Sequence, residues 1–310
     1  MSRNGPSAAL LADGRLHLQH GPIDLIIEAW GERAEVECAY RQAIVRFDDI
    51  LEVLVQELAQ LRTPLTEAYP LLRGPVARRM LAACWPYRAI YITPMAAVAG
   101  AVADEILQAM LNQRDLRKAY VNNGGDIALH LSEGSALTLG VVNNADNPAV
   151  DATVRLDSSM PVRGLATSGW RGRSQSLGIA DAVTIFAADA AAADAAATMV
   201  ANAVNIEHEA IARRPARALR ADSDLGDLPV TVAVDALPAS ARADALASGC
   251  ERARELQRQG LIFAAYLALQ GEVRAVLPAS SLAGQAVRRT VSGRICDSGS
   301  ASDEVLSELA

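Results

Sequence analysis

Two adjacent glycines between polar side chains form the strongest local candidate for a ligand site. Gly124 and Gly125 follow a short apolar run that is typical of a strand, with Asn122 and Asn123 before them and Asp126 after them. Glycines let a ligand approach bare backbone N–H groups, while the flanking amides and carboxylate can bind its polar edges. An ordinary hairpin turn with Asn and Gly at positive φ accounts for the same residues.

A carboxylate and a hydroxyl, Asp194 and Thr198, stand four residues apart in an alanine-rich segment. This spacing places both on one face of a helix, where hard oxygen ligands could hold Mg²⁺ or Ca²⁺. Taken alone, the pair is more typical of a solvated helix face than of a metal site.

A third cluster combines hydroxyls, backbone donors and cations, a set that suits a phosphate or a carboxylate. Its members predicted to bind a cofactor are Thr167, Ser168, Gly169, Arg171, Arg173 and Ser176. A solvent-exposed loop is the alternative interpretation.

Several common chemistries find no support in the sequence. The four histidines show neither HxH nor HExxH spacing, and no GxSxG, P-loop or GxGxxG occurs in a suitable context. The four cysteines lie far apart without CxxC spacing, which gives neither a zinc cluster nor a disulfide framework. Zinc-site, hydrolase, kinase and Rossmann interpretations are therefore not favoured. His20, between two predicted strands, is expected to be a surface histidine, with a place in a cleft as the alternative.

Composition limits the class of protein. With 310 residues, 51% hydrophobic and 21% charged, the chain can bury a sizeable core. A net charge of −7 argues against nucleic acid as a partner. The sequence predicts no signal segment and no membrane span, and the scattered cysteines favour a reducing cytoplasm.

Hydrophobic periodicity predicts the elements that must position these candidates. Strands are expected at 16–19, 23–30, 118–122, 127–131, 136–142, 151–156, 164–168, 181–187, 230–234 and 261–269. Helices are expected at 32–62, 76–84, 95–110, 190–204 and 239–259, with a polar linker or surface loop at 213–229. The pattern predicts a single α+β domain over 16–283, a disordered N-terminus at 1–15 and a frayed tail at 284–310.

The order of these segments resembles the ApbE-like superfamily. The shared features are a small-residue helix with a closing Asp (AGAVAD, 99–104), Asn-x-Gly-Gly-Asp-Ile, Thr-Ser-Gly, and Ala-Asp-Ala-x-x-Thr, together spanning about residues 16–205. The strings LQHGPIDLII, ITPMAAVAGAVADEI, VNNGGDI and TSGWRGRS look like an uncharacterised branch of that superfamily found in methanogens and bacteria, which extends the match to about residue 278.

The resemblance implies a fold and a ligand. It implies two similar sheet-and-helix subdomains around a central cleft, with FAD or FMN bound there. It also implies Mg²⁺ held by Asp194, Thr198 and a backbone carbonyl near the small-residue helix. Asn122, the two glycines and Asp126 would line the nucleotide cleft.

Two departures from the family pattern weaken the case for flavin transfer. ApbE enzymes carry a histidine in a His-x-x-Asp-Pro segment soon after Thr-Ser-Gly, whereas this stretch reads Ser174 to Ile179 with Gln175 and no histidine. Glutamine cannot act as a general base near neutral pH. The family's lysine before the glycine of the small-residue helix is replaced by Ala99.

The resulting expectation is a cytoplasmic protein that binds a flavin or other phosphorylated cofactor in an accessory biosynthetic role. Family context suggests sulfur and homocysteine metabolism or tetrahydromethanopterin-linked one-carbon metabolism. An Mg²⁺-dependent FAD:protein FMN transferase with another base is one alternative, and a structural or interaction protein with a vestigial cleft is another. The expected partners are a small-molecule ligand, a second copy in a homodimer, and enzymes of the same pathway, without nucleic acid or membrane.

Overall fold

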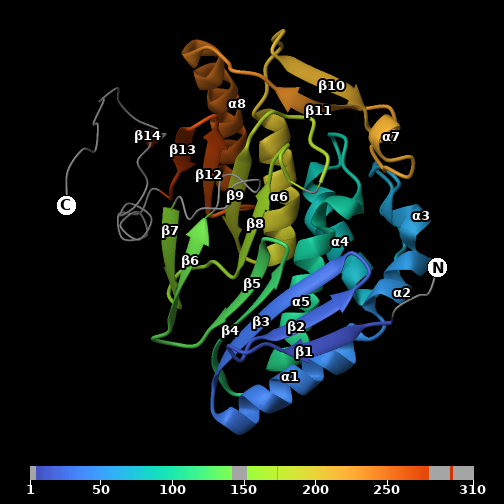
Figure 1. Ribbon diagram of the computed structural model, residues 1–310, viewed down its shortest axis with the longest axis vertical. Helices are drawn as coiled ribbons and strands as arrows, with labels where there is room; N and C mark the ends of the chain where they lie inside the picture. Colours follow the sequence, from blue (N-terminus) through green and yellow to red (C-terminus); the bar gives the residue numbers. More distant parts are fainter. Residues whose placement is uncertain (1–4, 142–151, 173, 279–293, 296–310) are drawn as a thin grey trace. The chain divides into compact units, whose positions relative to one another are not determined.

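The computed structural model describes residues 5–141, 152–172, 174–278 and 294–295, which form two compact units (Figure 1). Unit 1 comprises Met1–Leu137, Asp157–Ala166 and Phe186–Ala195, and unit 2 comprises Thr138–Leu156, Thr167–Ile185 and Ala196–Ala310. Each unit combines strands and helices, so the predicted α+β class is confirmed. The boundaries of a single domain at 16–283 stay a prediction.

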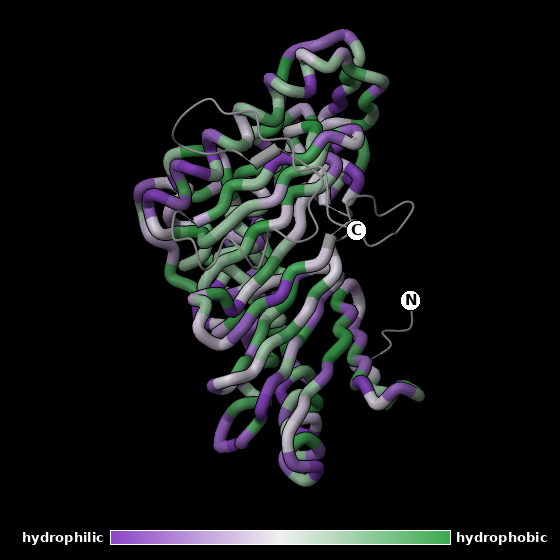
Figure 2. Tube along the Cα trace, turned by 90° about the vertical axis from the view of Figure 1, so that its left-hand side faces the viewer, coloured by the Kyte–Doolittle hydropathy of each residue, from purple (hydrophilic) through white to green (hydrophobic). Residues whose placement is uncertain are grey.

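Unit 1 contains an antiparallel meander. Its strands are β1 Ser7–Leu10, β2 Leu16–His20, β3 Ile23–Gly31, β4 Leu116–Asn123 and β5 Asp126–Leu131, each paired with the next. β5 pairs in addition with the start of β8 (Gly164–Ser168). Buried and more exposed residues alternate along β2 and the first half of β3. Figure 2 shows that hydrophobic and hydrophilic residues are closely interspersed along the chain.

The prediction of disorder through residue 15 is wrong for β1. All four β1 side chains are exposed, so the segment carries no hydrophobic signal. The strand forms because its backbone pairs with β2, from Ser7 opposite Gln19 to Leu10 opposite Leu16. The predicted tail at 284–310 lies outside the described residues except for the short strand β14, Arg294–Ile295.

A buried helix, α5 (Val98–Leu111), forms the centre of unit 1. The other helical segments of the unit are α1 Arg33–Phe47, α2 Ile50–Gln56, α3 Leu58–Leu61, α4 Pro75–Cys84, η1 Trp85–Tyr87 and η2 Pro94–Ala97. α5 packs against α1, α4, β4 and β5. The stretch Pro94–Leu111 is long and apolar enough to cross a membrane, but 56% of it is buried inside the fold, as in a core helix.

The single long helix predicted at 32–62 is interrupted twice. α1 ends before Asp48 and Asp49, and α2 ends at Glu57. The second break has a tertiary cause, because the Glu57 carboxylate accepts the backbone N–H groups of Arg73 and Gly74 at 2.7 and 2.8 Å. Within α2, the apolar Val55 is 54% exposed.

Unit 2 has its own strands and a long covering helix. Strands β9 (Ala182–Ala187), β12 (Ala264–Leu269), β13 (Glu272–Val276) and β14 follow one another in its sheet. α8 (Ala239–Arg258) packs on β12 and β13. The polar linker predicted at 213–229 is partly wrong, because β10 (Ile211–Pro215) pairs with β11 (Pro229–Val234) and the short helix α7 (Ala216–Leu219) follows β10.

Five elements contribute residues to both units: β6 (Ala136–Val141), β7 (Ala152–Asp157), β8, β9 and α6 (Ala190–Ala203). β6 and β7 pair with each other in a separate two-stranded sheet. The predicted metal ligands are both on α6, where Asp194 belongs to unit 1 and Thr198 to unit 2.

Candidate cofactor and metal site

The two predicted glycines form the tight turn of the β4–β5 hairpin. Gly124 and Gly125 have φ of 66° and 112°, and Asn123 pairs with Asp126 across the turn. The Asn122 side-chain oxygen accepts the Gly125 N–H at 2.8 Å. Both glycines are exposed, and the space beside Gly125 that a side chain would occupy is open. Both interpretations of this sequence are therefore compatible with the geometry: a hairpin turn, and a bare backbone surface that a ligand can reach.

The asparagine before the turn ties the hairpin to α5. Asn123 is only 5% exposed, and its side-chain N–H donates to the Ala99 carbonyl at 3.1 Å. Ala99 is in the first turn of α5, so its carbonyl oxygen also accepts the i+4 N–H within the helix, and both of its lone pairs are used. The turn and the start of the small-residue helix are thus held together within unit 1.

Asp194 reaches the same place from α6. Its Oδ2 accepts the Gly100 N–H at 3.0 Å. Removal from water raises the pKa of Asp194 well above its usual value, and the negative charge of Asp126 raises it further. Asp194, Asp126 and the Ala99–Gly100 backbone therefore form one group within unit 1, although they come from three elements.

Close packing of α5 on the beginning of α6 makes this approach feasible. A Cβ added at Gly100 would collide with the backbone of Ala190 and Ala191. Asp104, one turn further along α5, accepts the N–H groups of the same two residues at 3.0 and 2.9 Å. These bonds satisfy donors at a helix N-terminus that have no partner within the helix.

The electrostatics of Asp104 follow from this position. Burial and the nearby charge of Asp189 raise its pKa to about 6, against the two backbone hydrogen bonds and the charge of Arg79, which lower it. The sequence identified Asp104 as the closing Asp of a motif but gave it no role. The run of small residues before Asp104 could have indicated its role. Small residues allow two helices to pack closely, and a carboxylate beside them can then accept N–H groups at the start of the neighbouring helix.

The hydroxyl and arginine cluster lies in unit 2, where several members have structural partners. Thr167 and Thr184 share a hydrogen bond of 2.8 Å between their hydroxyls. A Cβ at Gly169 would collide with the backbone of Asp181, so close packing requires this glycine. Ser168 is half-buried at the end of β8, and Arg173 lies outside the described residues.

Ser176 is 4% exposed, and its hydroxyl is used internally. It donates to the Asn202 side chain at 3.3 Å and accepts the Gly178 N–H at 3.2 Å. The predicted ligand role of Ser176 stays a prediction, and these contacts explain its position without a ligand.

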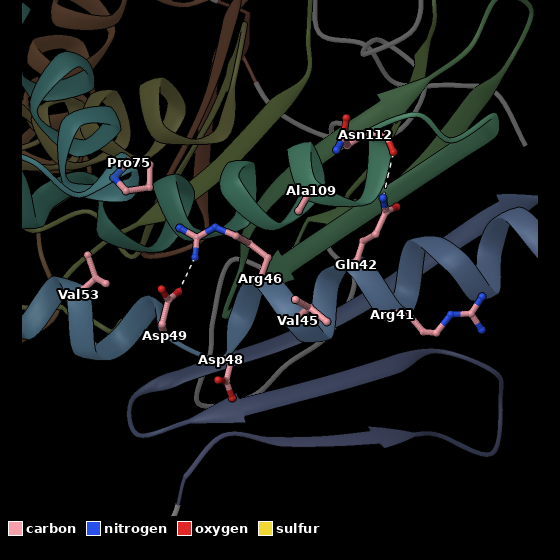
Figure 3. Close-up of a pocket in the computed structure, with 10 residues that line it drawn as sticks. All are labelled: Arg41, Gln42, Val45, Arg46, Asp48, Asp49, Val53, Pro75, Ala109 and Asn112. Atoms are coloured by element: carbon pink, nitrogen blue, oxygen red, sulfur yellow. Dashed lines mark hydrogen bonds and ion pairs between the residues drawn. The ribbon is translucent and has the colours of Figure 1, made fainter.

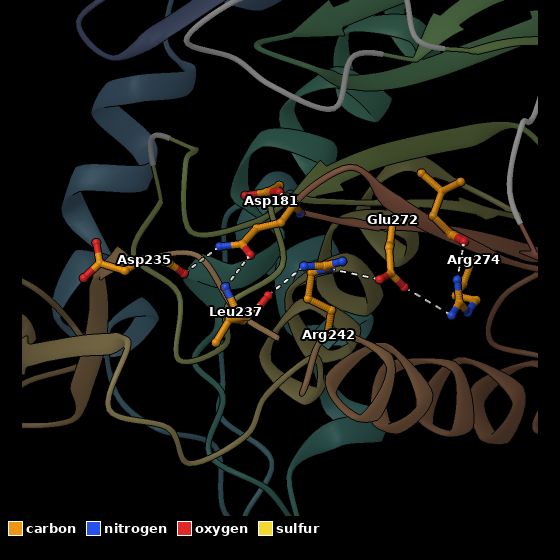
Figure 4. Close-up of polar contacts among 8 residues, drawn as sticks. Asp181, Asp235, Leu237, Arg242, Glu272 and Arg274 are labelled. Carbon is orange, nitrogen blue, oxygen red and sulfur yellow. Dashed lines mark hydrogen bonds and ion pairs between the residues drawn. The ribbon is translucent and has the colours of Figure 1, made fainter. Parts of the chain in front are cut away.

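Arg171 takes part in an ion pair that sequence reasoning missed. Its Nε donates to Asp181 at 2.9 Å, and its guanidinium lies over the Trp170 ring at 4.5 Å. Asp181 also accepts the Gln270 N–H. Gln270 in turn bonds to Asp235 and Leu237. Figure 4 shows the network passing from Leu237 through Arg242 to Glu272 and Arg274.

Gln175 occupies the stretch where ApbE enzymes carry a histidine. Its amide N–H donates to the Ala216 carbonyl at 3.0 Å, and its amide oxygen accepts the Ser223 hydroxyl. Both ends of the Gln175 side chain are therefore engaged within unit 2.

His20, in unit 1, is only 6% exposed and lies 3.4 Å from Glu52, so the predicted surface position of this histidine is wrong.

Parts of the chain are similar in sequence to known proteins. A UPF0280 protein of Methanothermobacter thermautotrophicus is 35% identical over 144 residues, which is 46% of this chain and 54% of the relative. A UPF0280 protein of Methanocaldococcus jannaschii is 39% identical over 113 residues, 36% of this chain and 45% of the relative. The chain thus spans about half the length of the curated relatives it matches.

The solved structure of an ApbE protein from Thermotoga maritima aligns with 91% of this chain and 99% of the Thermotoga chain. The two sequences are 13% identical over this alignment, and the TM-score is 0.46. The family model described as "AbpE bacteria" matches residues 8–275. This match spans most of the chain and contains all four of the sequence motifs. The chain therefore belongs to this ApbE-like family.

Proposed function

We propose that the protein binds a flavin or another phosphorylated cofactor, together with a divalent cation, where the Asn123–Asp126 turn meets Asp194. The observation that carries the proposal is that Asp194 and the Asn123 side chain bond to adjacent backbone groups at the start of α5, at 3.0 and 3.1 Å, which holds the Asp194 carboxylate beside the hairpin turn. The negative charge of Asp126 in that hairpin raises the pKa of Asp194. Like charges held together are costly, and a bound cation would offset that cost. No cationic side chain pairs with Asp194 among the described residues.

The donor set fits a hard cation such as Mg²⁺. The Asp194 carboxylate has about four lone-pair sites, and hydrogen bonds from the α5 backbone occupy only part of them. Thr198, the second predicted ligand, follows one helical turn after Asp194 on α6. Mg²⁺ prefers oxygen ligands and keeps several waters, so few protein ligands suffice. When bound, the cation would supply positive charge for the cofactor's phosphates.

The flavin class comes from the ApbE-like family to which the chain belongs. The exposed Gly124–Gly125 turn supports it, because a planar or phosphorylated ligand can lie against bare backbone there. Asp126 would accept hydrogen bonds from its ring or ribose.

An accessory role in biosynthesis is favoured over FMN transfer. Gln175 replaces the histidine, and its amide is engaged at both ends, so this position supplies no base. The protein would hold or deliver the cofactor for a partner enzyme, within sulfur and homocysteine metabolism or tetrahydromethanopterin-linked one-carbon metabolism. A cytoplasmic setting agrees with free thiols at Cys38, Cys84 and Cys250.

Thermal unfolding with FAD, FMN and Mg²⁺, singly and combined, tests the proposal. A ligand at about 100 times its Kd stabilises the folded state by about 2.7 kcal/mol, and FAD with Mg²⁺ should stabilise more than either alone. Asp194→Asn removes the anionic ligand and should weaken Mg²⁺-dependent binding about tenfold or more. Asp244→Asn, an exposed carboxylate on α8, is the matched control and should bind as the wild type does.

Two results would contradict the proposal. The first is no stabilisation by any flavin with Mg²⁺, which would favour a structural or interaction protein. The second is equal Mg²⁺ dependence in Asp194→Asn and the wild type. Incubation with FAD, Mg²⁺ and a flavin-acceptor protein separates binding from transfer, because a covalent fluorescent product would establish the transferase alternative.

A further inference from the structure

We propose that one exposed face of α1 is a twofold interface with a second copy of this chain. The face is a stripe of residues spaced alternately three and four apart, which places them on one side of a helix. The stripe consists of Cys38, Arg41 and Val45 on α1 and Asp48 at its C-cap; Glu52 follows in α2, beyond the break, and lies 3.4 Å from His20. This inference is independent of the proposed function.

Unit 1 does not use the stripe for its own packing. The buried side of α1 presents Ala39, Ala43 and Phe47 and contacts α5. On the stripe, by contrast, Val45 is 77% exposed, and the adjacent Ile44 is 39% exposed. Exposed β-branched side chains at the middle of a helix mark a place where burial against a partner would be favourable.

The charges on the stripe are separated along its length. Arg41 lies one turn before Val45, whereas Asp48 and Glu52 lie after it. Among the described residues, Arg41 and Asp48 have no ion-pair partner, although the Arg41 guanidinium contacts the Cys38 sulfur. The two charges of opposite sign nearest to Val45 are therefore both available.

This polarity makes the stripe complementary to itself. When two copies of α1 cross antiparallel with Val45 on the twofold axis, Arg41 of each copy faces Asp48 and Asp49 of the other. A twofold interface has this reciprocity, since a contact between two positions occurs twice. A parallel arrangement would bring arginine against arginine and aspartate against aspartate. The charges therefore favour a second copy, in one orientation, over a partner of uniform charge.

A groove beside the stripe gives the second copy room to pack. It has a volume of about 760 Å³; Arg41, Val45 and Asp48 line one side, and Pro75, Ala109 and Asn112 line the other. Figure 3 shows Gln42 reaching across it toward Asn112, whereas Arg46 pairs with Asp49 on its own side of the groove and Asp48 extends the other way. Gln42 and Arg46 already have partners within unit 1, so the rim residues remain for the interface.

Sedimentation of the full chain over a range of concentrations tests the interface. The wild type should dimerise, and Arg41→Asp or Asp48→Arg should each weaken dimerisation at least tenfold, because each leaves the stripe with a single sign of charge near Val45. A one-to-one mixture of these two variants should restore dimers, since their stripes are then complementary. Arg33→Asp, on the same helix but off the stripe, is the matched control and should leave the dimer intact.

Restored dimers in the one-to-one mixture would show that Arg41 and Asp48 face each other across the interface. All the substituted side chains are exposed, and circular dichroism of each variant checks that it is folded. The proposal is overturned if the wild type stays monomeric at every concentration. It is equally overturned if both single variants dimerise like the wild type, which would place the dimer on another face, or if the mixture forms no heterodimer.

Discussion

Carboxylates with limited access to water are held differently in the two units. In unit 1, Asp104 and Asp194 are held by backbone N–H groups of a neighbouring helix, at 2.9 to 3.0 Å. In unit 2, Asp181 pairs with the guanidinium of Arg171 and also accepts a backbone N–H. The first arrangement leaves negative charge unbalanced by a cationic side chain, whereas the second neutralises it.

This difference in charge balance distinguishes Asp194, a candidate cation ligand, from Asp181, whose contacts are structural. Raised pKa values at Asp104 and Asp194 show that their ionised forms are disfavoured where they lie. A bound cation would relieve that cost at Asp194, next to Ala99 and Asp126. The Asp181 network has internal partners for its charges and connects β12 to α8 and β13. Arg171 is therefore held by the fold, whatever ligand it also meets.

The largest expected effect comes from adding a side chain at Gly100, where α5 packs closely against the start of α6. Gly100→Ala places a Cβ against the backbone of Ala190, where no flexible side chain can yield. We expect a loss of about 3 kcal/mol in the free energy of unfolding, measured by urea denaturation. Gly5→Ala is the control, since nothing lies within 4 Å of its added Cβ. If Gly100→Ala unfolded at the same urea concentration as the wild type, the close packing of α5 on α6 would be contradicted.

The dependence of stability on pH tests the raised pKa of Asp104. Its folded-state pKa of about 6 exceeds the usual value of 3.8, so its stabilising contribution is complete below about pH 4 and is lost as the pH rises through 6. The wild type should therefore lose up to about 3 kcal/mol relative to Asp104→Asn between pH 4 and pH 7, at about 1.36 kcal/mol per pKa unit. Paired denaturation curves measure this difference. A trend of the opposite sign would refute the raised pKa.

The smallest expected effect concerns the ion pair in unit 2. Asp181→Asn and Arg171→Met should each cost about 1 to 2 kcal/mol, because Asp181 is mostly buried but Arg171 remains 29% exposed. The double variant should cost less than the sum, by about 1 kcal/mol of coupling, since neither partner is then left unpaired. Strict additivity in denaturant unfolding would show that the pair acts as two separate surface charges.

Much of the fold could be predicted from periodicity. The β2–β3 and β4–β5 hairpins, α4, α5, α6 and α8 follow apolar patterns that local chemistry enforces, and they lie where expected. The predictions failed where backbone partners distant in sequence decide the outcome. β1 depends on pairing with β2, and the end of α2 depends on Glu57 holding the backbone of Arg73 and Gly74. No local pattern encodes such partners.

The sequence by itself determined most of the elements, the resemblance to the ApbE-like family and the glycine turn, because residue type and spacing control those directly. Only the tertiary structure decided that Asp194 meets the start of α5 and lies near Asp126, that Asp104 caps α6, and that Arg171 pairs with Asp181. The physical reason is that the cost of a buried charge depends on the donors and charges around it, and folding brings these together from positions some ninety residues apart.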